Sequence, residues 1–485
     1  MEKTLQRSSI VFYLNGRRIE VTGQDTLKPF AYYLRYVLDM PGTKIVCSEG
    51  DCGACTLLIA PYRKNELQKF MAINSCITPV FSLDLSYVVT VEGLAESEEL
   101  STVQKCFIEN NGAQCGYCTP GFVCAMTALT EDCLLEKKQI TEKKARNYLT
   151  GNLCRCTGYA PIIKAAIAID LTAVKGLNRY VSPESLVEFK SLASSVHIRN
   201  TIAESNFELC LPKTLVDAVK LKTTDMRLVA GATDLGVLIN KNKLNFLKVM
   251  SLIHVDELNS IENKNGRIKI GARVTLAELE ETLKKNSEEF SEIFKIFASP
   301  QIKNTATLIG NIVNASPIAD SIPALMVLNT MIFTLSSKGS RCIAMTDFYM
   351  GYKQLDLLPN EIVTHIEFEL PAADEIFKLY KVSPRKDLDI SVVTFAGVFK
   401  LKNKTIETAR IAYGGVGPVV IRMKQLESKF VGNDFSENLF LKLSHEVEKE
   451  ISPLSDLRGS REFRLKLSEN LLKKCYHEIS QELSL

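Results

Sequence analysis

The first hundred residues alternate short apolar segments with turn signals. Segments 10–14 (IVFYL) and 17–21 (RRIEV) flank Asn15-Gly16, a dipeptide that strongly favours a two-residue hairpin, so they predict two paired strands. Apolar residues then recur at helical spacing from Leu27 to Leu38, and Pro41-Gly42 ends that predicted helix. The later runs TLLIA, KFMAINS and YVVTV predict further short strands.

From about residue 101 the periodicity becomes helical. A helix is predicted from Ser101 to Asn110, and a second helix follows QCGYCTPG with Thr119 as its N-cap. A third helix is expected over Thr141–Leu149, and a fourth begins near Pro161. The pattern therefore predicts a helical domain after a strand-rich one.

Past residue 206 the chain alternates strands and helices, after a linker-like stretch without strong periodicity. The segment 228–236 (LVAGATDLG) reads as a strand, a glycine turn and a helix, a geometry that points backbone N–H groups at a phosphate. Alone this is a weak signal, because a glycine after a strand more often marks only a turn. A second turn at 306–320 (ATLIGNIVNASPIAD) again offers small and hydroxyl residues.

Length and charge restrict the classes of protein. A chain of 485 residues is too long for one ordinary core and predicts three or four domains. The 59 basic and 56 acidic side chains nearly balance, so charge gives no reason to expect nucleic acid or a membrane as partner. The N-terminus has no apolar signal segment, and no run reaches 18 apolar residues, which predicts a cytoplasmic protein.

In that compartment the 14 cysteines are expected to stay reduced, and clustered ones favour metal binding or catalysis over disulfides. Eight fall into two groups, C-x4-C-x2-C with a distant fourth and C-x2-C with C-x-C. The two groups are Cys47, Cys52, Cys55 and Cys76, and Cys115, Cys118, Cys154 and Cys156. The other six are expected to be buried small residues, and the five histidines lie in no motif.

The first group matches a plant-type [2Fe-2S] ferredoxin in ligand spacing and in the order of hairpin, helix, cysteine loop and strands. Gly50, Gly53 and Ala54 leave room for backbone N–H groups to approach the sulfurs. A zinc site or accidental clustering are the alternatives, but structural zinc usually pairs two short knuckles. The second group lies at helix ends; alone it could bind zinc, whereas a neighbouring redox centre favours a second cluster.

The two groups, in this order and with QCGYCTPG and GNLCRCTGY intact, resemble the iron–sulfur region of the molybdenum hydroxylase family. That family includes xanthine dehydrogenases, aldehyde oxidases and carbon monoxide dehydrogenases. The two glycine turns resemble the pyrophosphate-binding segments of its FAD domain. Segments 381–391, 412–418 and 455–464 extend the resemblance almost to the C-terminus. The resemblance implies two [2Fe-2S] clusters, with the eight cysteines as ligands, and one FAD.

The resemblance also implies an α+β multidomain fold. Its parts are a β-grasp ferredoxin-like domain (8–94), a four-helix [2Fe-2S] domain (95–175), a linker (176–205), a two-subdomain α+β FAD-binding domain (206–373) and a C-terminal α+β flavoprotein domain (378–485).

The family's flavin contacts can be carried over residue by residue. Asp320 would bind the adenosine side, Phe297 would lie near the flavin, and Leu358 and Lys381 would line the site. Ile309 departs from the family, which usually has there the first glycine of a Gly-Gly pair. The two phosphate loops would be Leu228, Val229, Ala230, Gly231, Ala232, Thr233, Asp234 and Leu235, and Ala306, Thr307, Leu308, Ile309 and Gly310.

The domain order most resembles the iron–sulfur/FAD subunit of bacterial xanthine dehydrogenases. Because the chain ends shortly after the flavin domain, the resemblance implies a separate large subunit that binds the molybdenum cofactor, in a heterotetramer or larger assembly. It implies a relay of electrons from purine hydroxylation through both clusters and FAD to NAD+, with no catalytic acid, base or nucleophile on this chain.

Two alternatives stay open. One is the equivalent subunit of an aldehyde or other N-heterocycle hydroxylase, and the other is a stand-alone electron-transfer flavoprotein. Charge and apolar patterning predict no nucleic-acid or membrane partner in any of these cases.

Overall fold

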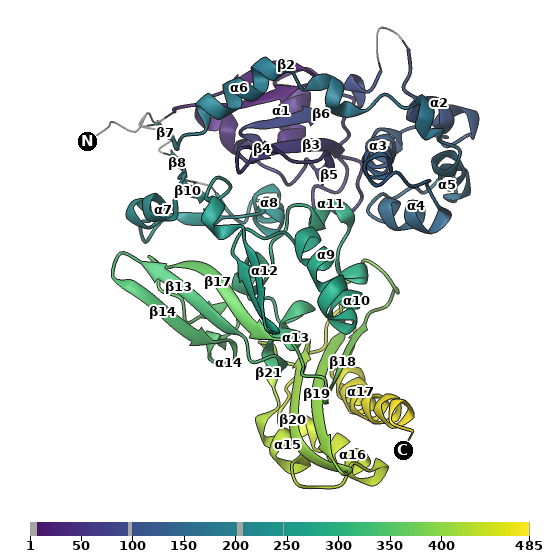
Figure 1. Cartoon of the computed structure of the whole chain (residues 1–485), viewed down its shortest axis with the longest axis vertical. Coiled ribbons are helices and arrows are strands. Elements are labelled where there is room, and N and C mark those ends of the chain that lie inside the picture. The colour runs from purple at the N-terminus through teal and green to yellow at the C-terminus, as the bar shows by residue number, and fades with distance from the viewer. Residues whose placement is uncertain (1–6, 96–98, 201–206, 246, 485) are drawn as a thin grey trace. The chain divides into compact units, whose positions relative to one another are not determined.

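A computed structural model of the chain describes residues 7–95, 99–200, 207–245 and 247–484 (Figure 1). The described residues fall into two compact units, and each is considered by itself. The first unit is drawn from Met1–Glu257 with Ser299–Ala306, and the second from Leu258–Ala298 with Thr307–Leu485. Among the described residues, no helix is both long enough and apolar enough to cross a bilayer.

A six-stranded sheet opens the first unit. Its order is β2-β1-β6-β3-β4, with β5 beside β3, and β1 runs parallel to β6 while the other pairs are antiparallel. The hairpin predicted at Asn15-Gly16 is confirmed, and both residues have the positive φ that a tight turn needs. The elements are β1 (Ile10–Leu14), β2 (Arg17–Val21), α1 (Phe30–Tyr36), β3 (Thr56–Arg63), β4 (Glu66–Leu67), β5 (Met71–Asn74) and β6 (Ser86–Val89).

Four helices follow this sheet and lie together in Figure 1. They are α2 (Thr102–Glu109), α3 (Thr119–Glu136), α4 (Glu142–Leu149) and α5 (Ala160–Ile167). The predicted N-cap at Thr119 is wrong, because Cys118 is the N-cap of α3. The carbonyl of Cys118 already accepts the N–H of Phe122 at 3.2 Å, so the helix starts one residue earlier.

The segment predicted as a linker contains α6 (Pro183–Leu192) and the start of a second sheet. This four-stranded sheet has the order β7-β8-β10-β9, with β8, β10 and β9 parallel and β7 antiparallel at the edge. Its elements are β7 (Val196–Asn200), β8 (Phe207–Leu211), α7 (Leu215–Leu221), β9 (Arg227–Val229), α8 (Thr233–Asn240) and β10 (Lys248–Ser251).

The two sheets of the first unit share one hydrophobic core. Phe12 and Phe30 of the first sheet region are completely buried and belong to the same cluster as Leu209, Leu211 and Val249. Burial of this common apolar surface joins the cysteine-bearing part of the chain to the strands that lead into the first glycine turn.

The second unit holds an antiparallel five-stranded sheet, β11-β12-β17-β13-β14, and an antiparallel four-stranded sheet, β18-β19-β20-β21. In Figure 1, the long α17 lies beside the four-stranded sheet. The strands are β11 (Ile261–Lys264), β12 (Arg267–Gly271), β13 (Met331–Ser336), β14 (Gly339–Ala344), β15 (Tyr349–Gly351), β16 (Gln354–Leu355), β17 (Ile362–Glu369), β18 (Glu375–Val382), β19 (Val393–Lys402), β20 (Thr405–Gly414) and β21 (Ile421–Arg422). The helices are α9 (Leu276–Asn286), α10 (Glu288–Phe297), α12 (Leu308–Asn314), α13 (Ser321–Val327), α14 (Met345–Phe348), α15 (Lys424–Phe430), α16 (Glu437–Ser444) and α17 (Arg461–Glu482).

Candidate iron–sulfur and flavin sites

The first cysteine group is brought together by the loop that follows α1. Cys55 and Cys76 are buried, Cys47 and Cys52 are half-buried, and thiol contacts join Cys52 to Cys47, Cys47 to Cys76 and Cys76 to Cys55. The backbone N–H groups of Glu49 and Cys52 lie 3.4 and 3.5 Å from the Cys47 sulfur. Hydrogen bonding from Cys52, then from Cys76, holds the pKa of the Cys47 thiol far below its usual range. The loop therefore favours the thiolate of Cys47, whereas the contacts with Cys47 raise the pKa of the Cys52 and Cys76 thiols that donate to it.

Backbone conformation and two asparagines hold this loop in shape. Gly50 and Gly53 have φ of +75° and +68°, a region that residues with a side chain rarely adopt. Asn74 donates to the Gly50 carbonyl at 2.6 Å. Asn240, the last residue of α8, donates to the carbonyls of Ser48 and Cys76, both at 2.8 Å. The fold thus fixes the positions of the sulfurs from two sides.

The second cysteine group meets in two pairs. The sulfurs of Cys115 and Cys156 are 3.4 Å apart, and the thiols of Cys118 and Cys154 are hydrogen-bonded to each other. Burial, with the contact to Cys154, raises the pKa of Cys118 to about 12, while the hydroxyl of Thr157 lies 3.1 Å from the Cys154 sulfur. Cys115 and Cys156 are exposed, so one pair faces outward and the other inward.

The two cysteine loops touch through their backbones. The N–H of Leu153 donates to the carbonyl of Cys52 at 2.9 Å, and the side chain of Asn152 donates to the carbonyl of Gly53, also at 2.9 Å. A Cβ atom on Gly53 would lie 2.1 Å from the carbonyl oxygen of Gly151. Gly53 therefore permits the close approach of one loop to the other, beyond the room near the sulfurs that the sequence predicted.

Two buried amides at this junction were missed by the sequence reasoning. Asn152 is 2% exposed and Gln301 is completely buried. Gln301, in α11 (Pro300–Lys303), donates to the side-chain oxygen of Asn152 at 2.8 Å and lies 3.3 Å from the hydroxyl of Thr56. The motif GNLCRC contains Asn152 and could have indicated it, whereas no motif contains Gln301.

The first predicted phosphate loop has the expected strand, turn and helix. β9 ends at Val229, α8 begins at Thr233, and Ala232 between them has a φ of +61°. No side chain of the described residues caps the start of α8, so its first N–H groups face the turn. A Cβ on Gly231 would lie 2.0 Å from the Thr305 carbonyl oxygen and 3.0 Å from the Cα of Ala306. The absence of a side chain at Gly231 thus permits the close approach of the Thr305–Ala306 backbone.

The second predicted phosphate loop divides between the units after Ala306. Thr307 caps α12 by accepting the N–H of Gly310 at 3.0 Å, so Gly310 lies in the first helical turn. Ile309, where the family usually has glycine, is 5% exposed and belongs to the buried apolar residues of the second unit. The isoleucine side chain at this position is thus buried.

The other predicted flavin residues lie in the second unit. Asp320 and Lys381 form a buried ion pair at 2.5 Å, and Ser391 donates to the second oxygen of Asp320. Burial raises the pKa of Asp320 despite the neighbouring ammonium. Phe297 packs edge-on against a neighbouring ring at 5.9 Å, and Leu358 is 48% exposed. The structure therefore brings Asp320 and Lys381 together, and their charges neutralise each other.

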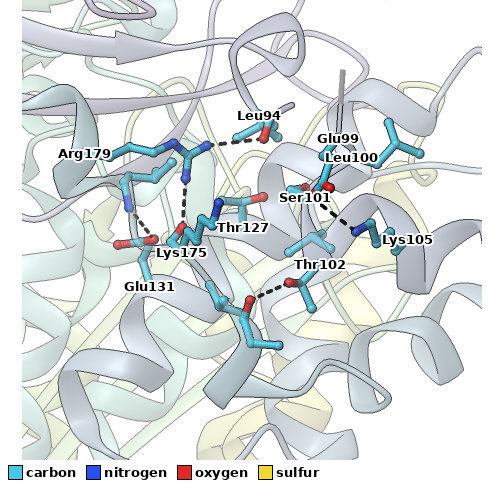
Figure 2. Close-up of a pocket in the computed structure, with 14 residues that line it drawn as sticks. Leu94, Glu99, Leu100, Ser101, Thr102, Lys105, Thr127, Glu131, Lys175 and Arg179 are labelled. Atoms are coloured by element: carbon cyan, nitrogen blue, oxygen red, sulfur yellow. Dashed lines mark hydrogen bonds and ion pairs between the residues drawn. The ribbon is translucent and has the colours of Figure 1, made fainter. Parts of the chain in front are cut away.

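A small cavity lies beside the helical domain (Figure 2). Its volume is about 110 Å³, and its lining, as far as the structure describes it, includes none of the predicted ligand or flavin residues. Figure 2 shows Arg179 bonded to the carbonyl of Leu94 and Lys105 facing Glu99. The buried Glu131 accepts the N–H of Leu177 at 2.9 Å. The contacts of Arg179 and Leu177 attach the segment after α5 to Leu94 and to α3.

Three families of known domains match the chain in the order of its elements. The family described as "[2Fe-2S] binding domain" matches residues 90–167. The "FAD binding domain in molybdopterin dehydrogenase" matches residues 205–372, and the "CO dehydrogenase flavoprotein C-terminal domain" matches residues 378–479. The fold class predicted from the sequence is thereby confirmed.

Whole proteins show the same likeness. The xanthine dehydrogenase/oxidase of Gallus gallus is 29% identical over 552 residues, which cover 98% of this chain and 40% of the relative. The Rattus norvegicus enzyme is 30% identical over 512 residues, covering 95% of this chain and 38% of the relative. The chain thus spans about two fifths of the length of these curated relatives.

Among solved structures, one chain of the Cu,Mo-CO dehydrogenase in its cyanide-inactivated form is 25% identical, with a TM-score of 0.53. The match covers 56% of this chain and 97% of that chain. The paired thiols, the FAD-type domains and these relatives agree on one assignment. The chain belongs to the molybdenum hydroxylase family and carries its [2Fe-2S] and FAD-binding domains.

Proposed function

We propose that the chain holds two [2Fe-2S] clusters and one FAD, and that it relays electrons from a molybdenum-binding partner to NAD+. On this proposal it is the iron–sulfur/FAD subunit of a xanthine dehydrogenase. Bound FAD would supply the exchange between single electrons and a hydride. The residues of this chain bind and position the cofactors, and none of them acts on the substrate.

The arrangement of the sulfurs supports the two clusters. Each iron of a [2Fe-2S] cluster takes two cysteine ligands, and the second group offers the pair Cys115 and Cys156 and the pair Cys118 and Cys154. A single zinc ion would instead draw all four sulfurs to about 3.8 Å of one another, given Zn–S bonds of about 2.3 Å. Backbone N–H groups beside Cys47 would offset the negative charge of the first cluster.

One observation supports the relay, namely a continuous line of contacts through the first unit. The second cysteine loop meets the first where Leu153 bonds to Cys52. The first loop then meets α8, because a Cβ on Gly236 would lie 2.2 Å from the Ile77 carbonyl and Asn240 bonds to the carbonyl of Cys76. Since α8 begins at the first phosphate loop, this contact sequence supports the order helical-domain cluster, ferredoxin-type cluster, FAD.

The relatives support the substrate and the partner. Relatives that match almost the whole chain are xanthine dehydrogenases, and the matched solved chain comes from a Cu,Mo-CO dehydrogenase, a molybdenum enzyme. We therefore propose a purine as substrate of the partner, NAD+ as acceptor and a heterotetramer or larger assembly. An aldehyde or another N-heterocycle would require the same relay from this chain.

The test separates the relay from the hydroxylation. The chain, loaded with iron, sulfide and FAD, should oxidise NADH with an artificial dye as acceptor and should leave xanthine unchanged. Addition of the molybdenum-binding partner should give xanthine-dependent reduction of NAD+. Xanthine hydroxylation by the chain alone, or failure to oxidise NADH in the FAD-loaded protein, would contradict the proposal. Aldehyde turnover without xanthine turnover in the complex would favour the aldehyde alternative.

A further inference from the structure

The four-stranded sheet of the first unit has two chemically different faces. Side chains alternate across a strand, and Val196, Ile198, Leu209 and Leu211 all belong to the apolar core shared with the first sheet. His197, Glu208 and Cys210 therefore project from the opposite face. Val249 of β10 also joins the core, so that strand contributes Lys248 and Met250 to the opposite face.

On that opposite face, strand register brings three metal-ligating side chains together. His197 of β7 lies directly opposite Cys210 of β8, and Glu208 is two residues from Cys210 on the same strand. The Nε2 atom of His197 is 2.7 Å from Oε1 of Glu208, and the Cys210 sulfur is 3.9 Å from that oxygen. All three ligand atoms lie within 4.8 Å of one another.

We propose that His197, Glu208 and Cys210 form a zinc-binding site, independent of the two cysteine loops. Imidazole nitrogen, carboxylate oxygen and thiolate are the ligands that zinc takes in proteins, at about 2.0–2.3 Å. Tetrahedral geometry with these bonds separates neighbouring ligand atoms by about 3.4–3.6 Å. The distance between His197 Nε2 and Glu208 Oε1 would open by about 0.7 Å, and the distance between the Cys210 sulfur and that oxygen would close by about 0.4 Å, which side-chain rotation allows.

Burial and charge suit a divalent ion at this place. Cys210 is completely buried, while the side chains of His197 and Glu208 are 12% and 20% exposed, so the site is shielded but reachable. A thiolate and a carboxylate together carry the two negative charges that Zn²⁺ would neutralise. Three protein ligands leave the fourth coordination position of the zinc ion for water, as in zinc sites with only three protein ligands. The ordinary alternative is a hydrogen-bonded histidine–glutamate pair without metal.

The experiment uses the holoprotein with its clusters and flavin. After dialysis against dilute Zn²⁺ and removal of excess metal, zinc and iron are counted, and X-ray absorption at the zinc edge reports the ligands. We expect about one zinc per chain with one sulfur and otherwise nitrogen or oxygen ligands, and unchanged iron content. Absence of retained zinc would overturn the proposal. Zinc with four sulfur ligands would also overturn it, because that metal would occupy a cysteine loop.

Variants identify the ligands. Cys210→Ala and His197→Gln should each weaken zinc binding at least about 100-fold, more than the 10–100-fold loss typical for a group that only supports a ligand. Met250→Leu is the matched control, because Met250 is aligned with Cys210 on β10 and equally buried, yet zinc rarely uses a thioether. Unchanged affinity in Cys210→Ala, or loss of zinc in Met250→Leu, would overturn the ligand set.

Discussion

Replacement of Gly53 by alanine tests whether the two cysteine loops depend on their backbone contact. Gly53 has a φ of +68°, and its added Cβ would lie 2.1 Å from the Gly151 carbonyl oxygen and 2.9 Å from the Cα of Asn152. Gly158 offers a matched control, since its φ is +69° and a Cβ there would meet nothing within 4 Å. Both substitutions place alanine in the left-handed region, and only one forces the loops apart.

The expected magnitudes follow from these contacts. Left-handed alanine costs about 1 kcal/mol at either position. At Gly53 the clash can be relieved only by parting the loops, which breaks the Leu153–Cys52 and Asn152–Gly53 hydrogen bonds, both 2.9 Å long. Each such bond contributes about 1 kcal/mol. Gly53→Ala should therefore destabilise the first unit by about 3 kcal/mol, and Gly158→Ala by about 1 kcal/mol.

The assay is thermal unfolding of the holoprotein under anaerobic conditions, followed by the visible circular dichroism of the clusters. At about 2–4 °C per kcal/mol, the midpoint should fall by about 6–12 °C in Gly53→Ala and by about 2–4 °C in Gly158→Ala. Electron paramagnetic resonance should show both cluster signals altered in Gly53→Ala, because Gly53 contacts both loops. Equal, small shifts in the two variants with unaltered signals would refute the reasoning.

Other predictions concern single cofactors. Cys154→Ser should remove or alter one [2Fe-2S] resonance and Cys55→Ser the other, because the two residues lie in different loops. Cys342→Ser is the control and should leave both resonances; the prediction that Cys342 is buried is wrong, since the structure exposes it on β14. A cluster lost in that control would disprove the ligand sets. Gly231→Val should abolish FAD binding and NADH-dependent dye reduction while both clusters persist, because the valine side chain would clash with the carbonyl oxygen of Thr305. Gly417→Ala, which meets only ordinary contacts at 3.6 Å or more, should keep its flavin; full flavin retention in Gly231→Val would contradict this role for the turn.

Local signals in the sequence predicted local structure well. Asn15-Gly16 predicted the first hairpin because the positive φ of a tight turn depends on the turn residues themselves. The strand, turn and helix at 228–236 were also predicted, because periodicity and the turn glycine are likewise local signals. The predicted N-cap of α3 was one residue too late, because Cys118 and Thr119 can both precede a helix and only the hydrogen bonds of the folded helix decide between them.

Tertiary contacts were beyond such reasoning. Gly53 was expected to make room for N–H groups near the sulfurs, yet its missing side chain also admits the Gly151 backbone, about a hundred residues away in sequence. Gln301 lies in no motif, and it bonds to Asn152 only because the fold places α11 beside that residue. His197 and Cys210 looked scattered, since only the pairing register of β7 and β8 makes them neighbours. The cysteine ligand sets themselves stay predictions.

The central claim is that this chain carries two [2Fe-2S] clusters and one flavin. Its most direct test is elemental and cofactor analysis of the native protein, with iron, acid-labile sulfide, zinc and FAD counted per chain. Two four-cysteine [2Fe-2S] sites predict about four iron, four sulfide and one FAD. A single zinc at the proposed His197 site would leave these counts unchanged. About two iron and two sulfide, with zinc bound by four sulfurs in place of the second cluster, would contradict the account.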